Sequence, residues 1–368
     1  MDTKKSLGNP GFFNYAELRS ICYNKQMKAG KKIVLTADRP SGNLHIGHYA
    51  GSLANRVRLQ NGGEYEMFVM IADLQALTDH ANDVQKVTTS VEELMLDYLA
   101  VGLDPQKIHF VLQSAIPALY ELPMFYANLV TQARLERNPT VKTEIKTKGY
   151  RREVPVGFVN YPISQAADIT AFGASLVPVG ADQAPMLEQT REIVATFNRL
   201  YGETLVMPVA MIPEKACGRL VGIDGAGKMS KSLGNCIYIK DSEEELRRKI
   251  NSMYTDPNHI KVSDPGKVEG NVVFMYLDAF YDDKKHLAEL KAQYRQGGLG
   301  DVTLKKLLFE CLNGILAPMR ERRAYYEQHM DEVRSYLRDG TKRALEVTNV
   351  TLQNVKHAMG IYQLGVHE

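Results

Sequence analysis

Short apolar runs and longer amphipathic stretches alternate along the first half of the chain. Runs of strand length lie at residues 32–36, 67–73, 109–113 and 176–179. Stretches whose apolar residues recur with helical spacing lie at residues 46–59, 87–101 and 186–201. Parallel strands need a crossover between them, so this alternation is typical of a parallel sheet with helices on its faces. The pattern therefore predicts an α/β domain of the Rossmann type, with a doubly wound parallel sheet.

The second half of the chain changes to long helical patterns. Ser242 followed by Glu245 predicts a capping box that starts a helix near Glu243. From Val302 onward an apolar stripe follows at helical spacing. Its members are Leu304, Leu307, Leu308, Cys311, Leu312, Ile315, Leu316 and Met319. We expect Gly340 to break this helical pattern and a last helix to run from about residue 341 to residue 359.

These changes in pattern divide the chain into three parts. Residues 1–30 form a polar N-terminal extension with a short helical stretch at residues 15–27. We expect residues 31–235 to form the α/β domain, with an insertion around residues 110–170. Residues 236–368 are expected to form a helical domain whose last helix packs back on the α/β domain. Within the insertion, the chain from 135 to 152 is basic and weakly periodic, and it is predicted to be a mobile loop.

Composition narrows the picture only a little. The chain has 368 residues, with 45 basic and 43 acidic side chains, so its net charge neither requires nor excludes a nucleic-acid partner. The cysteines Cys22, Cys217, Cys236 and Cys311 show no C-x-x-C spacing, and neither a zinc site nor a disulfide framework follows from them. We find no apolar run of membrane-spanning length and no secretory signal, so a cytoplasmic protein without membrane contact is expected.

Two histidines follow the first predicted strand and open the helix after it. His45 and His48 are three residues apart, so they lie on the same side of the first turn. A helix N-terminus presents free backbone N–H groups, which suits phosphate. Gly47 between the histidines leaves room against the backbone for a ribose or a base. An isolated pair with this spacing is most often a surface or capping pair, and its place directly after the first strand is what favours a phosphate site.

A second candidate motif lies in a glycine-rich stretch late in the α/β domain. Lys228 and Lys231 are three residues apart, and Gly225, Gly227 and Gly234 surround them, which favours a movable loop that can hold an anionic leaving group. A lysine pair in such a loop is usually only a solvated turn, and the significance here comes from its combination with the histidine pair. The stretch from 222 to 228 also nearly matches a P-loop, but Met229 stands where that motif needs Ser or Thr.

Together, residues 45–48 (His-Ile-Gly-His) and 228–232 (Lys-Met-Ser-Lys-Ser) resemble the paired HIGH and KMSKS motifs of class I aminoacyl-tRNA synthetases. The surrounding sequence is similar to the tryptophanyl branch of that family over roughly residues 31–360. The segments that carry the similarity are 39–44, 49–53, 161–169, 177–183, 188–193 and 197–198.

The resemblance implies a role for particular residues. His45, His48, Lys228 and Lys231 would be catalytic, acting on the ATP phosphates and the departing pyrophosphate. The residues expected to bind ATP are Arg39, Gly47, Gly180, Asp182, Met229, Ser230 and Ser232. Those expected to bind L-tryptophan are Tyr161, Gln165, Asp168 and Gln183, with Asp168 accepting the indole N–H. No protein ligand for a metal is implied, and Mg²⁺ would be held mainly by the ATP phosphates.

The family further implies a homodimer, with tRNA(Trp) recognised by the helical domain. At one position the chain departs from the common tryptophanyl pattern, because Gln165 stands where that pattern has Met. Tyr161, Gln165 and Asp168 also match the pattern of tyrosyl-tRNA synthetases, so tyrosine remains an alternative substrate. A related nucleotidyltransferase with a small acceptor and a non-catalytic paralogue are two further hypotheses. The long helical second half argues against the first, and the intact histidines and lysines argue against the second.

Overall fold

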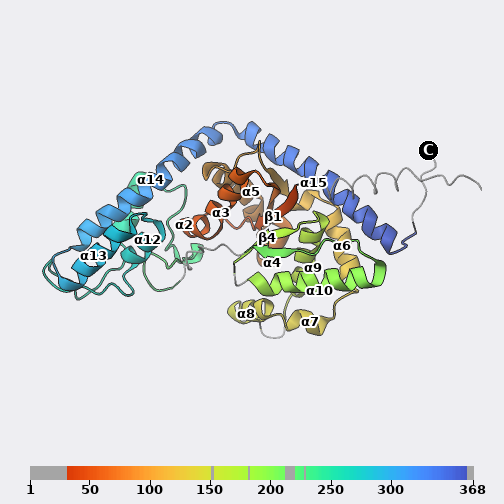
Figure 1. The fold of residues 1–368 in the computed structure, drawn as a ribbon, viewed down its shortest axis with the longest axis horizontal. Helices are drawn as coiled ribbons and strands as arrows, with labels where there is room; N and C mark the ends of the chain where they lie inside the picture. The colour runs from red at the N-terminus through yellow and green to blue at the C-terminus, as the bar shows by residue number, and fades with distance from the viewer. Residues whose placement is uncertain (1–30, 151–152, 181–182, 212–219, 228, 363–368) are drawn as a thin grey trace, which may run out of the picture.

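The computed structural model describes residues 31–150, 153–180, 183–211, 220–227 and 229–362 (Figure 1). The predicted short helix at residues 15–27 lies outside these ranges, as do Cys22 and Cys217. No helix within the described ranges is long and apolar enough to cross a membrane.

A five-stranded sheet forms the centre of the α/β part of the molecule. Its strands are β1 (Lys32–Asp38), β2 (Tyr65–Ile71), β3 (His109–Leu112), β4 (Leu176–Pro178) and β5 (Val209–Met211). They lie in the order β3-β2-β1-β4-β5, and every pairing is parallel. The order reverses at β1, which is the place where a doubly wound sheet opens a crevice beyond the carboxyl ends of its strands. The predicted Rossmann-type fold is confirmed, although the short strand β5 was not predicted from the sequence.

The helices of this part follow the strands in chain order. After β1 come α2 (Ile46–His48), the π-helical turn η1 (Tyr49–Leu53) and α3 (Ala54–Gly62). After β2 come α4 (Asp73–His80) and α5 (Val84–Ala100), and the turn η2 (Gln113–Ala115) follows β3. The single helix predicted for residues 46–59 is therefore three consecutive helical pieces, because a π-turn interrupts the regular hydrogen bonding after the second histidine.

Between β3 and β4 the chain forms four helices. They are α6 (Ala118–Tyr126), α7 (Gln132–Glu136), α8 (Pro139–Thr147) and α9 (Val156–Ala171). The prediction of a mobile basic loop over residues 135–152 is wrong for its described part, because α8 occupies most of it. Asn138 caps that helix by accepting the N–H of Thr140, and Pro139 at its first position fixes a helical φ. Residues 151 and 152 lie outside the described ranges.

Between β4 and β5 lies α10 (Ala184–Tyr201), close to the helix predicted for residues 186–201. After the turn η4 (Lys231–Leu233), the C-terminal part of the chain is helical, as predicted. It contains α11 (Glu243–Asn251), α12 (Val272–Phe280), α13 (Lys284–Gln296), α14 (Asp301–Glu327) and α15 (Met330–Ala358). The predicted capping box at Ser242 is present, since its hydroxyl accepts the N–H of Glu245 at 3.1 Å. In Figure 1, α14 runs over α12 and α13 and then meets α15 at an angle. Helix α15 packs on the edge strand β3.

The predicted break at Gly340 is wrong. The break between the long helices falls at Gln328 and His329, and Gly340 lies inside α15. A Cβ atom at this position would lie 2.1 Å from the carbonyl oxygen of Phe110 in β3. Because it has no Cβ, Gly340 allows α15 to pack closely against β3. Beside it, the Thr341 hydroxyl accepts the N–H of Leu112 at 3.1 Å, which pairs part of the outer edge of the sheet.

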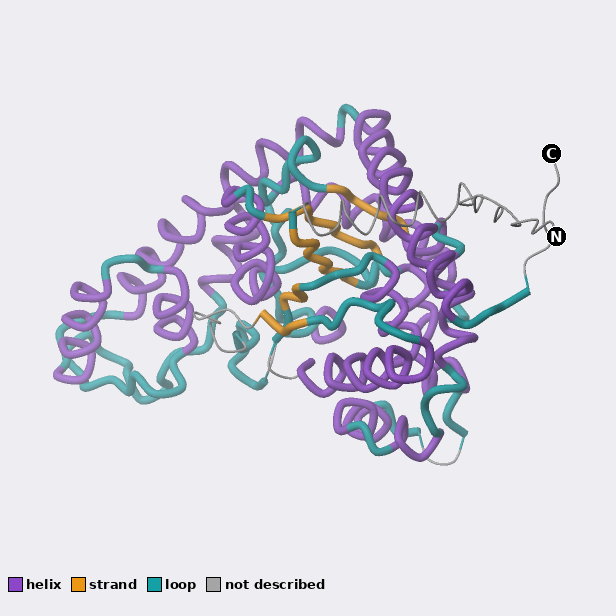
Figure 2. Tube along the Cα trace, turned by 45° about the vertical axis from the view of Figure 1, so that its right-hand side comes forward, coloured by secondary structure: helices purple, strands orange, loops and turns teal. Residues whose placement is uncertain are grey.

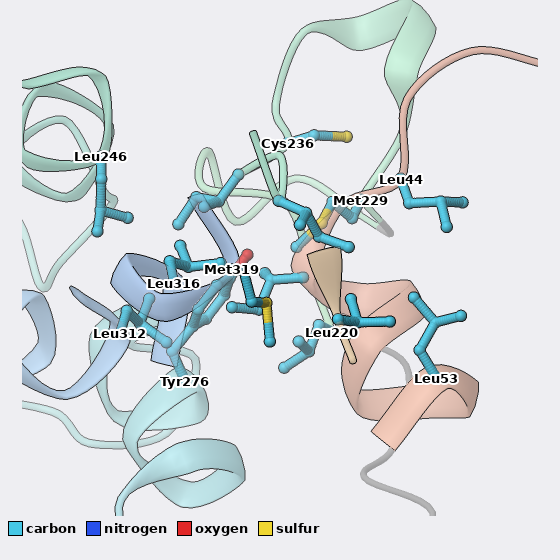
Figure 3. Close-up of a cluster of buried hydrophobic side chains, with 14 of the residues drawn as sticks. Leu44, Leu53, Leu220, Met229, Cys236, Leu246, Tyr276, Leu312, Leu316 and Met319 are labelled. Carbon is cyan, nitrogen blue, oxygen red and sulfur yellow. The ribbon is translucent and has the colours of Figure 1, made fainter. Parts of the chain in front are cut away.

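One apolar cluster joins the two halves of the molecule. Figure 3 shows Leu44 and Leu53 from the chain after β1 near Leu220 and Met229, with Leu316 and Met319 of α14 packed beside them. These side chains are all nearly inaccessible to solvent. The segment that carries the first motif, the segment that carries the second and the long helix α14 thus share a single core. In Figure 2 the strands are surrounded by helices, in keeping with a sheet buried on both faces.

Candidate active site

The turn between β1 and α2 places the two predicted histidines together. Their ring centroids are 3.8 Å apart. The backbone N–H of His45 donates to Nδ1 of His48 at 3.1 Å, so the neutral His48 ring carries its proton on Nε2. A Cβ on Gly47 would lie 2.9 Å from Nδ1 of His45. The glycine therefore makes room for the imidazole of His45 itself, in the space where the sequence suggested a ribose or base.

Both histidines are neutral near pH 7. Burial lowers the pKa of His45 to about 3, helped by the neighbouring His48 and Lys231. Burial also lowers the pKa of His48 to about 4, although the carboxylate of Asp38 opposes the shift. A neutral imidazole still donates one N–H, so the pair can bind phosphate oxygens as hydrogen-bond donors and not as cations.

A buried polar cluster that we did not predict lies next to this turn. Asp38, the last residue of β1, accepts Nη1 of Arg56 at 2.5 Å and the hydroxyl of Tyr98 at 2.7 Å. The guanidinium of Arg56 is nearly inaccessible to solvent. These partners hold the pKa of Asp38 below its usual value against the effect of burial. The cluster fixes the carboxyl end of β1, from which the histidine turn departs.

The second motif is a loop braced by Asn235. The Oδ1 atom of Asn235 accepts the N–H of Ser230 at 2.8 Å, and its Nδ2 donates to both oxygens of Asp224 at 3.1 Å. A Cβ on Gly222 would lie 2.1 Å from that Nδ2, so the close packing depends on glycine there. Met229 is buried in the shared core. Asn235 is a positioning residue that the sequence alone did not single out.

Lys231 connects the two motifs directly. Its Nζ donates to the carbonyl oxygen of Gly42 at 2.8 Å and lies 3.4 Å from the hydroxyl of Ser41. Both partners belong to the turn that leads into the histidines. Burial lowers the pKa of Lys231, and nearby carboxylates oppose the shift. The structure thus brings one of the two predicted lysines to the histidine turn. The other, Lys228, lies outside the described residues, and of Ser232 only the backbone is described.

A cavity of about 390 Å³ opens at the carboxyl end of β1 and β4. Six residues predicted as binding residues line it: Arg39, Tyr161, Gln165, Asp168, Gly180 and Gln183. Asp38, Ser52 and Arg56 line it as well, so the cavity borders the polar cluster beside the histidine turn. His45 and His48 do not line it. Asp182 lies outside the described residues.

Asp168 is a buried carboxylate that lines this cavity. It projects from α9, is 6% exposed, and receives the side-chain amide of Gln113 at 2.9 Å on each oxygen. Burial raises the pKa of Asp168 to about 7, with Gln113 opposing the shift and Asp73 adding to it. A buried carboxylate with unused acceptor capacity suits an N–H or O–H donor on a ligand. Gln113 was not predicted, because nothing in its sequence surroundings indicates that it meets α9.

Arg39 is held at the rim of the cavity by a charged cluster. Its Nη1 donates to Asp79 of α4 at 2.7 Å, and Lys148 pairs with the other oxygen of the same carboxylate. The Lys148 ammonium also lies 5.5 Å from the ring centroid of Phe158. Two cations therefore share one carboxylate beside the cavity.

A larger cavity, of about 800 Å³, lies between α5 and α15, and none of the predicted site residues lines it. In the part of the chain that the structure describes, no group of three or more His, Cys, Asp or Glu side chains is placed to hold a metal ion. The polar groups that converge at β1, β4 and α9 therefore mark the better candidate site.

The chain is similar to known proteins over most of its length. A family model described as tRNA synthetases class I (W and Y) matches residues 27–317. A protein of Clostridium longisporum named Tryptophan--tRNA ligase is 57% identical over 90% of this chain and 97% of its own length. One of the same name from Streptococcus pneumoniae is 56% identical over 90% of this chain and 98% of its own.

Among solved structures, that of tryptophanyl-tRNA synthetase from Campylobacter jejuni complexed with ADP and tryptophan has a TM-score of 0.78 at 32% identity. It is matched over 89% of this chain and 100% of its own. The chain therefore belongs to the class I tRNA synthetases of the tryptophan and tyrosine branch.

Proposed function

We propose that the chain activates L-tryptophan with ATP and transfers the activated amino acid to tRNA(Trp). The observation that carries the proposal is the cavity at the carboxyl ends of β1 and β4, where Arg39, Gly180 and Asp168 come from three separate segments to line one space. Relatives that are 56–57% identical over most of their length are named Tryptophan--tRNA ligase, which favours tryptophan over tyrosine.

In the first step, a carboxylate oxygen of the amino acid attacks the α-phosphorus of ATP. A P–O bond forms to give the aminoacyl-adenylate, and the bond to pyrophosphate breaks. We assign His45 and His48 to the phosphate chain as neutral donors and Lys228 and Lys231 to the negative charge on the departing pyrophosphate. Positioned donors and cations of this kind stabilise charge that develops in the transition state. The Lys231–Gly42 hydrogen bond supports this assignment, because it keeps that ammonium beside the histidine turn.

The remaining contacts to ATP are assigned by position. Arg39 and Gly47 lie in the histidine turn. Gly180 and Asp182 follow β4 in the sequence, and we assign both to the adenosine ribose. In the second motif we assign Met229, Ser230 and Ser232 to ATP. Mg²⁺ would be held mainly by phosphate oxygens and water, and would help neutralise the phosphate charge.

For the amino acid, we propose that Asp168 accepts the indole N–H. The other parts of the tryptophan molecule would contact Tyr161, Gln165 and Gln183. The raised pKa of Asp168 supports a role in recognition, because such shifts gather at functional sites. Gln113 orients the carboxylate by binding both of its oxygens. Gln165 would orient the ammonium group of the substrate.

In the second step, a ribose hydroxyl at the 3′ end of tRNA attacks the acyl carbon and AMP leaves. We propose that the helical part from α11 to α15 recognises tRNA(Trp), and that residues 31–235 form the catalytic domain. We also propose a homodimer in the cytoplasm.

The proposal is tested by ATP–pyrophosphate exchange with each of the twenty amino acids in turn. We expect exchange that depends on L-tryptophan. Tyrosine is the demanding competitor, because its hydroxyl can also donate to Asp168. Phenylalanine has no donor for that carboxylate, so we expect it to be rejected strongly. Faster exchange with tyrosine would overturn the choice of substrate and keep the family. No exchange with any amino acid would overturn the enzymatic proposal.

A further inference from the structure

The carboxylate of Asp97 joins two parts of the molecule that are far apart in sequence. Asp97 lies on α5 and is completely buried. One oxygen, Oδ2, accepts the backbone N–H of Leu44 at 2.6 Å. The other, Oδ1, accepts Nη1 of Arg323 on α14 at 2.7 Å. A single side chain therefore connects the residue before His45 to the long helix that spans the helical part.

Each of the three guanidinium nitrogens of Arg323 donates a hydrogen bond to a carboxylate, and the side chain is almost fully buried. Besides Asp97, it donates from Nη2 to Glu93 at 2.7 Å and from Nε to Glu327 at 2.8 Å. Its side chain is 6% exposed. Glu93 in turn pairs with Lys240 at 3.3 Å, which follows the second motif. The planar fork of arginine suits this arrangement, since it can bind several carboxylates in fixed directions.

Leu44 is held on both sides of its peptide. Its N–H is bound by Asp97, and its carbonyl oxygen accepts the N–H of Ile239 at 3.0 Å. The next hydrogen bond runs from the N–H of Ile46 to the carbonyl oxygen of Ile237 at 2.9 Å. His45 lies between these fixed points, so the position of its backbone follows from the position of Leu44. The apolar side chains in Figure 3 pack around the same junction.

Burying this ion pair is costly, and an apolar pair of similar size would stabilise the fold as well or better. The ion pair differs from an apolar pair because its hydrogen bonds fix the relative positions of Leu44, Asp97 and Arg323. By contrast, Arg334 on α15 also pairs with a glutamate of α5, Glu92, at 2.8 Å, but that pair is half exposed and touches nothing in the histidine turn. Of these two pairs, the buried one is built to fix the turn.

We propose that Asp97 and Arg323 are positioning residues for the ATP phosphates: they fix the turn of residues 42–48 by tying it to α14. The inference rests on the proposed function only in taking this turn as the phosphate site. It extends that function by making the packing of the helical part a determinant of ATP binding. Because coupling between sites is reciprocal, ATP bound at the turn also stabilises the contact between α14 and α5.

The test compares Asp97→Asn and Arg323→Met with the matched control Arg334→Met in tryptophan-dependent pyrophosphate exchange. Active-site titration corrects each rate for the folded fraction. We expect the KM for ATP to rise about tenfold or more in the first two variants, the size of effect that a lost charged hydrogen bond produces. The KM for tryptophan should stay within about twofold. Arg323→Lys, which keeps the charge and one contact, should recover part of the loss.

Hydrogen exchange of the Leu44 amide gives a second readout, which needs no activity. We expect the Leu44 amide hydrogen to exchange faster in Arg323→Met and to keep its wild-type protection in Arg334→Met. A purely structural role would lower thermal stability and leave both KM values unchanged after correction, and that result overturns the inference. If Arg323→Met does not fold, the KM for ATP and the Leu44 amide exchange of Arg323→Lys are measured instead, and wild-type values for both overturn the inference. If the wild-type protein shows no pyrophosphate exchange, the proposed function is wrong. Hydrogen exchange of the Leu44 amide then tests the inference by itself.

Discussion

The protonation state of Asp168 should control the binding of tryptophan. The pKa of this buried carboxyl is raised to about 7, so the ionised acceptor predominates only above that pH. Below it, the protonated group is a weaker acceptor for an indole N–H. We therefore expect kcat/KM for tryptophan to rise about tenfold from pH 6 to the plateau above pH 7, since this ratio reports the ionisation of the free enzyme. The histidines of the turn, with pKa values of about 3 and 4, do not titrate in this window.

Asp168→Asn keeps the shape of the side chain and removes its charge. A hydrogen bond to a charged group contributes about 1.5–3 kcal/mol, so we expect a loss of about ten- to a hundredfold in kcat/KM for tryptophan and a flat pH profile. Gln113→Leu removes the donor that lowers the pKa, so its profile should shift to higher pH. The chain contains no tryptophan, so the fluorescence of the bound ligand gives the same titration as a dissociation constant. A wild-type profile that is flat between pH 6 and 8, or an Asp168→Asn variant whose profile keeps the wild-type slope, would show that ionisation of Asp168 does not control tryptophan binding.

Two further predictions rest on single contacts, and a third rests on exposed positive charge. Lys231→Ala should lower the single-turnover rate of adenylate formation about 10²–10³-fold while changing ATP affinity little, and an unchanged rate would remove this lysine from catalysis. Gly340→Ala should destabilise the fold by about 1–3 kcal/mol or more in denaturant unfolding, because its Cβ would overlap Phe110, whereas Gly314→Ala, with open space around it, should be neutral or stabilising. Replacing the exposed Lys261 and Lys267 by Ala should raise the KM for tRNA and reduce its salt dependence. If the variant and the wild type have the same tRNA kinetics, tRNA binds to another surface.

Much of the fold could be predicted because its strands and helices have strong local patterns. The four predicted strands are present as β1 to β4, and the capping box at Ser242 starts α11. The short strand β5 has only three residues, too few for a periodic pattern to appear. In α8 the capping residue and the proline were visible in the sequence, but the lysines around them suggested a solvated loop. They lie on the outer face of a short helix instead.

Residues that act through distant partners could not be predicted. Gly340 has the sequence signature of a helix break, and only the approach of β3 shows why a helix contains it. Gln113 and Asp97 are ordinary polar residues in the sequence. Their importance comes from partners 55 and 226 positions away, at Asp168 and Arg323. Motif residues were easier to find, because the chemistry of phosphate binding concentrates them at the ends of strands.

We propose that this chain attaches tryptophan to tRNA(Trp) and that the cavity lined by Asp168 binds the amino acid. The most direct measurement is aminoacylation by the purified protein of tRNA(Trp) and tRNA(Tyr), each offered labelled tryptophan or labelled tyrosine, with Asp168→Asn in parallel. We predict that label from tryptophan appears on tRNA(Trp) alone, and that the variant charges it far more slowly. Charging of tRNA(Tyr) with tyrosine would contradict the choice of substrate, and an Asp168→Asn variant that charges tRNA(Trp) at the wild-type rate would contradict the role of this cavity.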